Sequence, residues 1–131
     1  MTPNTESAIK RALACQPGVK LAIVFGSMVS DQERFDSDLD LAVDAGKRLT
    51  VSEKMTLIGD LALETGRPID LVDLRSVGEP LLGQILNHGK RLLGSDTDYA
   101  ALISRHLLDQ ADFVPYRNRI LAERRRAWIG R

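Results

Sequence analysis

A glycine–serine pair and two aspartates are the residues of this sequence whose types and spacing could do chemistry. Gly26 and Ser27 end a short apolar run, and Asp38 and Asp40 follow after a spacer of ten residues. A glycine at the end of a strand lets the backbone turn sharply and approach a ligand closely. If a helix begins at Ser27, its free amides and the serine hydroxyl suit a phosphate group. The pair therefore predicts a phosphate-binding turn.

Asp38 and Asp40 lie in a segment, 37–43, in which polar or small residues alternate strictly with apolar ones. Such alternation is typical of a strand, so both carboxylates project from one face, about 7 Å apart along the strand. Two parallel carboxylates beside a phosphate site are what a divalent cation such as Mg²⁺ needs to bridge a protein and a nucleotide. Each pattern alone is common on ordinary surfaces, and it is their joined spacing that favours a nucleotide site.

The elements that must position these residues follow from apolar periodicity and from helix-capping patterns. We predict strands at 19–25, 37–43, 68–74 and 90–93, and helices at 5–16, 50–63 and 80–87. Thr50 with Glu53 is a capping-box pattern, and we expect Ser76 with Glu79 to cap the third helix. Strands separated by helices indicate an α/β or α+β fold, with a small mixed sheet flanked by helices and a helical C-terminal arm.

Length and composition narrow the class of protein. The 131 residues fit a single domain, with a core at about 5–94 and the arm at about 95–131. The only cysteine, Cys15, excludes a disulfide framework and a multi-cysteine zinc site, and we expect it to be buried in the first helix. No apolar run approaches the roughly 18 residues of a membrane span, and the first ten residues do not resemble a signal peptide. We expect a cytoplasmic protein that contacts no membrane.

The arm contrasts with the core in charge. Its end carries Arg124, Arg125, Arg126 and Trp128, whereas the whole chain has 18 basic and 18 acidic residues. The zero net charge and the few aromatic residues argue against nucleic acid as a partner. Because Trp and Arg are enriched in the centres of interfaces, we expect this end to bind a protein. We expect His106 to be a surface or interface residue and His88 to cap the end of a helix.

The pattern G-S-x10-D-x-D formed by Gly26, Ser27, Asp38 and Asp40 resembles the signature of the DNA polymerase β nucleotidyltransferase superfamily. The chain is similar in particular to the minimal nucleotidyltransferases (MNT) that serve as antitoxins in HEPN/MNT toxin–antitoxin pairs. The resemblance covers about residues 8–128, including the arginine-rich tail, and implies a polymerase β-like fold. The sequence departs from many relatives at Asp31, where they carry glycine.

The family also has a third acid on a later strand, and two residues of the segment 68–74 could supply it. Alternation puts Asp70 and Asp73 on opposite faces of that strand, so only one of them can face Asp38 and Asp40. Asp73 adjoins the next loop, where aspartate is common as a turn residue. Asp70 lies mid-strand, where an unpaired carboxylate is costly unless it binds a cation. We prefer Asp70 and keep Asp73 as the alternative.

The resemblance implies a mechanism and a partner. Asp38, Asp40 and Asp70 would hold Mg²⁺, Gly26 and Ser27 would hold the triphosphate, and AMP would pass from ATP to a tyrosine hydroxyl of a cognate HEPN ribonuclease toxin. The chain would then be a protein adenylyltransferase that neutralises its toxin. Two alternatives stay open: an antitoxin with weak catalysis that neutralises the toxin by stoichiometric binding, and a nucleotidyltransferase that acts on a small molecule.

Overall fold

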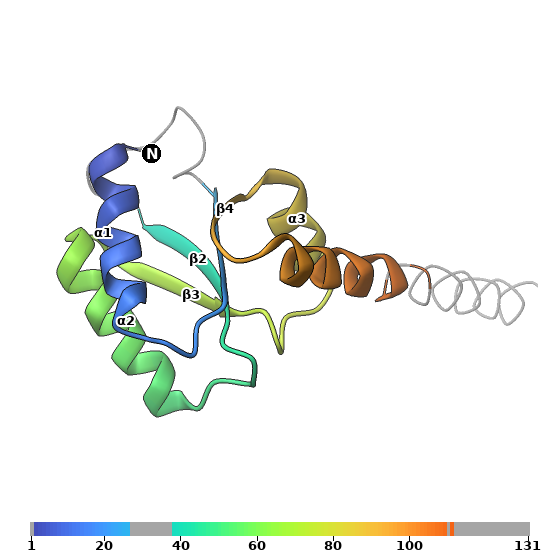
Figure 1. Cartoon of the computed structure of the whole chain (residues 1–131), viewed down its shortest axis with the longest axis horizontal. Coiled ribbons are helices and arrows are strands. Elements are labelled where there is room, and N and C mark those ends of the chain that lie inside the picture. Colours follow the sequence, from blue (N-terminus) through green and yellow to red (C-terminus); the bar gives the residue numbers. More distant parts are fainter. Residues whose placement is uncertain (1, 27–37, 110, 112–131) are drawn as a thin grey trace, which may run out of the picture.

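The computed structural model describes residues 2–26, 38–109 and 111. The elements that they form, in chain order, are α1 (Pro3–Ala14), β1 (Leu21–Phe25), β2 (Leu39–Asp44), α2 (Val51–Thr65), β3 (Ile69–Asp73), α3 (Leu81–His88), β4 (Lys90–Leu93) and a further helix over 96–109 (Figure 1). Each predicted strand and helix of the core is present, with ends that shift by at most two residues. Among the described residues, none of these helices is both long and apolar enough to cross a membrane.

The four strands form one mixed sheet in the order β3-β2-β1-β4. Strand β1 pairs antiparallel with β2 and with β4, whereas β2 and β3 run parallel. The register places Phe25 opposite Asp40, and Asp40 opposite Asp70. Three segments that are far apart in the sequence therefore bring one residue each into a single row across the sheet. The mixed sheet flanked by helices confirms the predicted fold class.

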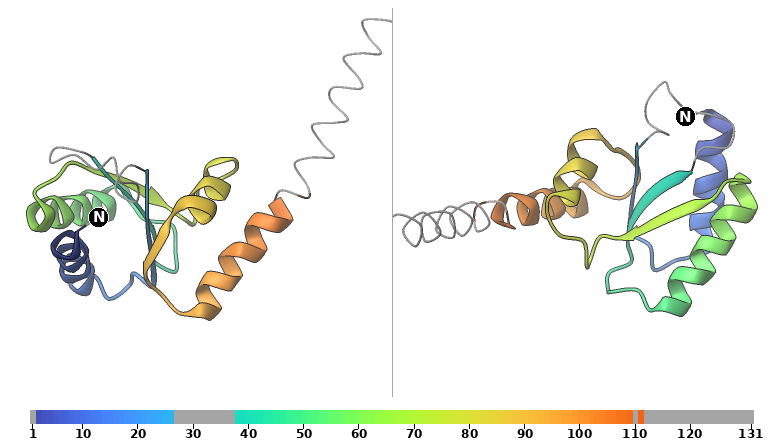
Figure 2. Two further views of the ribbon diagram at one scale, coloured as in Figure 1. Left: turned by 90° about the horizontal axis from the view of Figure 1, so that it is seen from above. Right: turned by 180° about the vertical axis from the view of Figure 1, so that it is seen from behind.

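Helices cover both faces of the sheet (Figure 2). Helices α1 and α2 pack on one face, where Leu39, Leu41 and Val43 of β2 are fully buried. Helix α3 and the helix 96–109 pack on the other face, over a second apolar cluster that includes Ala42. Because side chains alternate along a strand, Asp40 projects from the same face as Ala42. The acid-bearing row therefore lies on the α3 side of the sheet.

The capping box predicted for α2 is confirmed. The Thr50 hydroxyl accepts a hydrogen bond from the Glu53 amide, and the Glu53 carboxylate accepts one from the Thr50 amide, both at 3.1 Å. The helix ends at Gly66, whose φ of 67° lies in the left-handed region that favours glycine. These two ends fix the length of the crossover that joins β2 to the parallel strand β3.

The cap predicted for α3 is wrong for Ser76, and only Glu79 of the predicted pair bonds to the first turn of the helix. The Ser76 hydroxyl contacts the carbonyl of Asp73 instead, because residues 73–77 form a tight turn closed by the Val77 amide. Helix α3 begins after Pro80, whose own side chain offers no capping bond. The Glu79 carboxylate accepts from the Gly83 amide and lies 2.5 Å from Nδ1 of His106. The turn and this pair use the residues that the sequence assigned to a cap.

Two other predictions are corrected. The sequence indicates a surface or interface position for His106, but its side chain is only 12% exposed, because it contacts Glu79 beside α3. Cys15 is exposed rather than buried. The buried stripe of α1 ends with Ala12 and Leu13, and Cys15 is the C-cap residue that follows the last helical residue, Ala14. The predicted apolar stripe of the arm at 113–128 and its arginines lie outside the described residues.

Candidate active site

The centre of the candidate site is a pair of carboxylates on neighbouring parallel strands. Asp40 of β2 and Asp70 of β3 are register partners, and paired strands lie about 4.8 Å apart. Burial raises the pKa of the Asp40 carboxyl above its ordinary value, and the charge of Asp70 and a hydrogen bond with it raise the pKa further. The nearby charge of Asp38 acts in the same direction. The pair thus carries an excess of negative charge that a proton or a cation would neutralise.

The backbone of Gly26 lies directly against the Asp40 carboxylate of this pair. It follows β1 with a φ of 73°, and a β-carbon at this position would lie 2.1 Å from Oδ2 of Asp40. A side chain would therefore both strain the backbone and collide with the carboxylate. The sequence predicts a close approach of the backbone at Gly26, and the group it approaches within the described residues is Asp40.

The other predicted acids fall in different places. Asp38 is exposed and precedes β2 by one residue, two residues before Asp40. Asp73 lies on the opposite face of the sheet, is 4% exposed, and accepts hydrogen bonds from the amides of Leu49 and Arg75 at 2.8 and 2.9 Å. The structure therefore places Asp70, and not Asp73, beside Asp40. Ser27 and Asp31 lie outside the described residues.

The donor set suits a cation that is shared with a substrate. Among the described residues, no three His, Cys, Asp or Glu side chains converge closely enough to enclose a metal ion by themselves. Mg²⁺, however, is usually bound through one or two carboxylates and completes its coordination with water and substrate phosphates. Asp40 and Asp70, with their mutual repulsion, fit that incomplete arrangement.

A hollow of about 260 Å³ lies on the β1 side of the site and shares Gly26 with it, since Gly26 lies against Asp40. Phe25, Gly26, Gln84 and His88 line it, and we refer to it as the α3 hollow. Sequence reasoning did not single out Gln84 and took His88 as a cap. A signal was available, because residues four apart on a helix share one face. Gln84 and His88 have this spacing, and both are exposed while Ile85 between them is buried.

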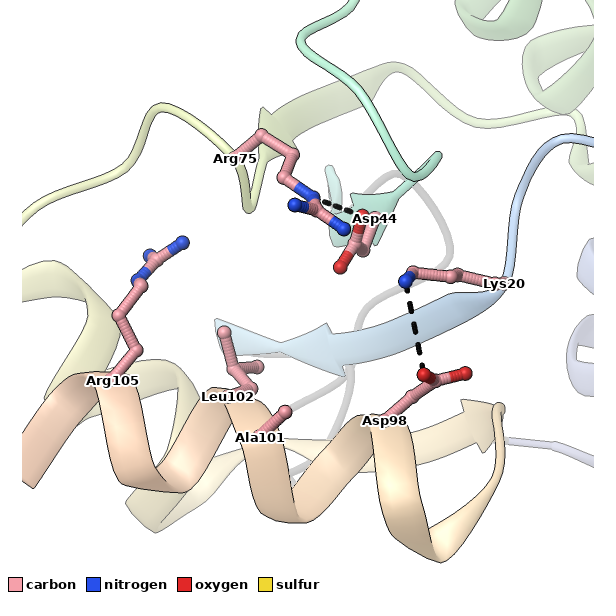
Figure 3. A pocket seen from close by; sticks show the side chains of 7 residues that line it. All are labelled: Lys20, Asp44, Arg75, Asp98, Ala101, Leu102 and Arg105. Carbon is pink, nitrogen blue, oxygen red and sulfur yellow. Dashed lines mark hydrogen bonds and ion pairs between the residues drawn. The ribbon is translucent and has the colours of Figure 1, made fainter.

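A second hollow, of about 120 Å³, lies near the opposite end of β2 (Figure 3). Four of its five charged groups bind in pairs: Arg75 Nε is 2.8 Å from Asp44 Oδ1, and Lys20 Nζ is 3.7 Å from Asp98 Oδ1. Burial would raise the pKa of Asp44, but the hydrogen bonds from Arg75 and the Gly46 amide lower it on balance. We interpret this hollow as an ion-pair network that joins the sheet to the helix 96–109.

Known proteins are similar to this chain in both sequence and structure. Residues 7–98 match the family model Polymerase beta, Nucleotidyltransferase. The sequence is 35% identical over 95 residues to Protein adenylyltransferase MntA of Shewanella oneidensis. The aligned region covers 72% of this chain and 68% of that protein.

Two solved structures share the fold. The first is a crystal structure of a toxin–antitoxin with AMP-PNP, with a TM-score of 0.79, 28% identity and coverage of 90% of this chain and 96% of that chain. The second is a tri-AMPylated Shewanella oneidensis HEPN toxin in complex with MNT antitoxin, with a TM-score of 0.74, 28% identity and coverage of 91% and 94%. The matched residues 7–98 span Gly26, Asp38, Asp40 and Asp70.

Proposed function

The chain belongs to the polymerase β nucleotidyltransferase family, and from that premise we propose that it is an antitoxin that AMPylates a HEPN toxin. In this proposal AMP passes from ATP to a tyrosine hydroxyl of the toxin, which is thereby neutralised. The observation that carries the proposal is the register pairing of Asp40 with Asp70, which concentrates negative charge beside the glycine that ends β1.

The relatives support the substrate and the partner. One relative is a protein adenylyltransferase, one solved structure holds AMP-PNP, and another contains an AMPylated HEPN toxin beside its MNT antitoxin. These properties belong to those proteins, and we extend them to this chain because its sequence and fold are similar over most of its length.

In this proposal, each residue of the candidate site has its own role in the reaction. Asp38, Asp40 and Asp70 would hold divalent cations such as Mg²⁺, which when bound neutralise phosphate charge and lower the pKa of an attacking hydroxyl. Gly26 lets the backbone lie directly against Asp40, and it would hold the triphosphate together with Ser27. Asp70 accepts the proton of the tyrosine hydroxyl. The tyrosine oxygen forms a bond to the α-phosphorus while the bond to the departing pyrophosphate breaks.

The proposal implies that a neighbouring gene encodes a HEPN protein, and transfer of AMP to that protein tests it. The two proteins are incubated with ATP and Mg²⁺, and the mass of the HEPN protein is followed. We expect additions of whole AMP units with the wild-type chain and none with Asp40→Asn or Asp70→Asn. Asp109→Asn, which changes an exposed aspartate on the helix 96–109, is the control and should transfer normally. A stable complex without any transfer by the wild-type chain would instead support neutralisation by stoichiometric binding.

A further inference from the structure

The α3 hollow shares its wall with the candidate site. Phe25 is the register partner of Asp40, and Gly26 lies against the carboxylate of Asp40. Both residues also line the hollow. A substrate whose phosphates lie at Asp40 would therefore have its next group within reach of the hollow.

The hollow lies on the side of Asp40 that suits the nucleotide better than the acceptor. In the sheet order β3-β2-β1, Asp70 is on one side of Asp40, and Phe25 and Gly26 are on the other. In-line transfer needs the attacking and leaving oxygens on opposite sides of the phosphorus. If Asp70 takes the proton of the acceptor hydroxyl, the acceptor approaches past β3. The hollow beside β1 is then left for the nucleotide.

The α3 residues that line the hollow are held in fixed positions. Leu82 and Ile85 anchor the helix in the core, and the Gly89 amide donates to the carbonyl of Ile85 at 2.8 Å. A β-carbon on Gly89 would lie 2.5 Å from the Ile23 side chain, so the end of α3 approaches β1 very closely. Gln84 and His88 are thus presented to the hollow by a helix that cannot move away without disrupting this packing.

The chemistry of the lining fits a nucleobase. The Gln84 amide offers a donor and an acceptor side by side, which is the arrangement that pairs with N6 and N7 of adenine. The ring of Phe25 and the imidazole of His88 are planar groups on which a base can stack. The lining residues include no carboxylate, Lys or Arg among the described residues, so the hollow does not suit a phosphate or a metal ion.

We infer that the α3 hollow receives the nucleoside of ATP, and that Gln84 and His88 determine which nucleotide the chain prefers. This inference rests on the proposed function, because it takes the site at Asp40 to hold a nucleoside triphosphate. The volume of about 260 Å³ is just below that of ligand pockets, which run from about 300 to 1,000 Å³, so the hollow has space for one small group such as the nucleobase of a nucleoside.

Nucleotide affinity measured on the full chain tests the inference. Calorimetry with Mg²⁺ compares ATP, GTP and CTP with inorganic tripolyphosphate, which lacks the nucleoside. Gln84→Ala should weaken ATP binding by about tenfold and reduce the preference for ATP over CTP. His88→Ala should weaken all three nucleotides. Neither variant should change the affinity for tripolyphosphate. Asn87→Ala, an exposed neighbour on α3 that does not line the hollow, is the matched control.

Each contrary result has its own meaning. If Gln84→Ala and His88→Ala keep the ATP affinity and selectivity of Asn87→Ala, the inference is wrong while the proposed function stands. If they instead raise the KM for the HEPN protein with ATP affinity unchanged, the hollow belongs to the acceptor and the inference is again overturned. If the wild-type chain binds tripolyphosphate and every nucleotide too weakly to measure, the proposed function fails together with the inference.

Discussion

A β-carbon on Gly26 would lie 2.1 Å from Oδ2 of Asp40. The end of β1 therefore lies directly against the carboxylate at the centre of the candidate site. Asp40 can keep its position only if residue 26 has no side chain. The relationship joins the glycine of the G-S pair to the second aspartate of the D-x-D pattern, which are separated by 13 intervening residues in the sequence.

Gly26→Ala should therefore impair transfer through Asp40 as well as strain the backbone. We expect AMP transfer to fall by roughly 100-fold or more, because displacement of one group that stabilises the transition state commonly costs that much. Gly46→Ala is a matched control: Gly46 has a φ of 77°, similar to that of Gly26, but a β-carbon there would meet nothing within 4 Å. Both variants should lose stability in thermal unfolding, and only Gly26→Ala should lose transfer. Equal activity in the two variants would refute the contact argument.

The same substitution should have opposite effects on stability at two aspartates. Asp40 repels Asp70 and Asp38, so Asp40→Asn should leave the free energy of unfolding unchanged or slightly higher in metal-free buffer, while it abolishes transfer. Asp73 accepts two backbone hydrogen bonds at a site that is 4% exposed, so Asp73→Asn should lower the free energy of unfolding by about 1–3 kcal/mol. Urea unfolding of the two variants measures both effects. A marked destabilisation by Asp40→Asn would show that Asp40 has a structural role.

The raised pKa of Asp40 predicts how stability depends on pH. A carboxyl with a higher pKa in the folded chain than in the unfolded chain binds its proton more tightly when folded. Its contribution to stability is complete below the ordinary value of 3.8 and is lost as the pH rises through the raised pKa. In metal-free buffer, the unfolding free energy of the wild type relative to Asp40→Asn should therefore fall as the pH rises above 3.8. Urea unfolding across this range measures the difference.

Asp44 provides a control for which stability should change with pH in the opposite direction. Its pKa is lowered on balance by Arg75 and Gly46 against the effect of burial, so its contribution is present above the ordinary value and is lost as the pH falls. The unfolding free energy of the wild type relative to Asp44→Asn should rise with pH. Added Mg²⁺ should flatten the Asp40 profile and leave the Asp44 profile unchanged, because a cation at Asp40 favours the ionised carboxylate. Two parallel profiles would contradict the assignment of charge repulsion to the Asp40 site.

The strand faces of Asp40 and Asp70 could be predicted because the evidence for them is local. Strict alternation on β2 fixes the face of Asp40, and the same rule separates Asp70 from Asp73 before any pairing is known. Which strands pair is decided by contacts between distant segments. The family resemblance could therefore suggest the register of Asp40 with Asp70, whereas local residue patterns could not. The roles of these acids in the reaction remain predictions.

The residues that sequence reasoning missed owe their roles to tertiary contacts. Glu79 fits a capping pattern, yet it contacts His106, which is 27 residues away in the chain. His88 looks like an ordinary helix end until α3 is placed beside β1 and the α3 hollow forms. The sequence predicts Cys15 on the apolar side of the first helix, but the helix ends at Ala14 and Cys15 is its exposed C-cap residue. Local patterns give the elements and their faces, and only their assembly shows which polar residues meet.

Arg105 holds the helix 96–109 against the turn after β3, and a change to lysine should loosen that contact. Its guanidinium donates to the carbonyls of Leu74 and Val77, the latter at 3.0 Å. A lysine ammonium is a single point donor and cannot span both carbonyls as the planar guanidinium does. Arg105→Lys should therefore lower the free energy of unfolding by about 1–2 kcal/mol, since one partly buried carbonyl loses its partner. Arg11→Lys is the control: Arg11 forms an exposed ion pair with Glu64 at 3.3 Å, and such pairs contribute about 0–1 kcal/mol. Urea unfolding of both variants measures the difference, and equal small losses would mean that the helix 96–109 is held by its apolar contacts alone.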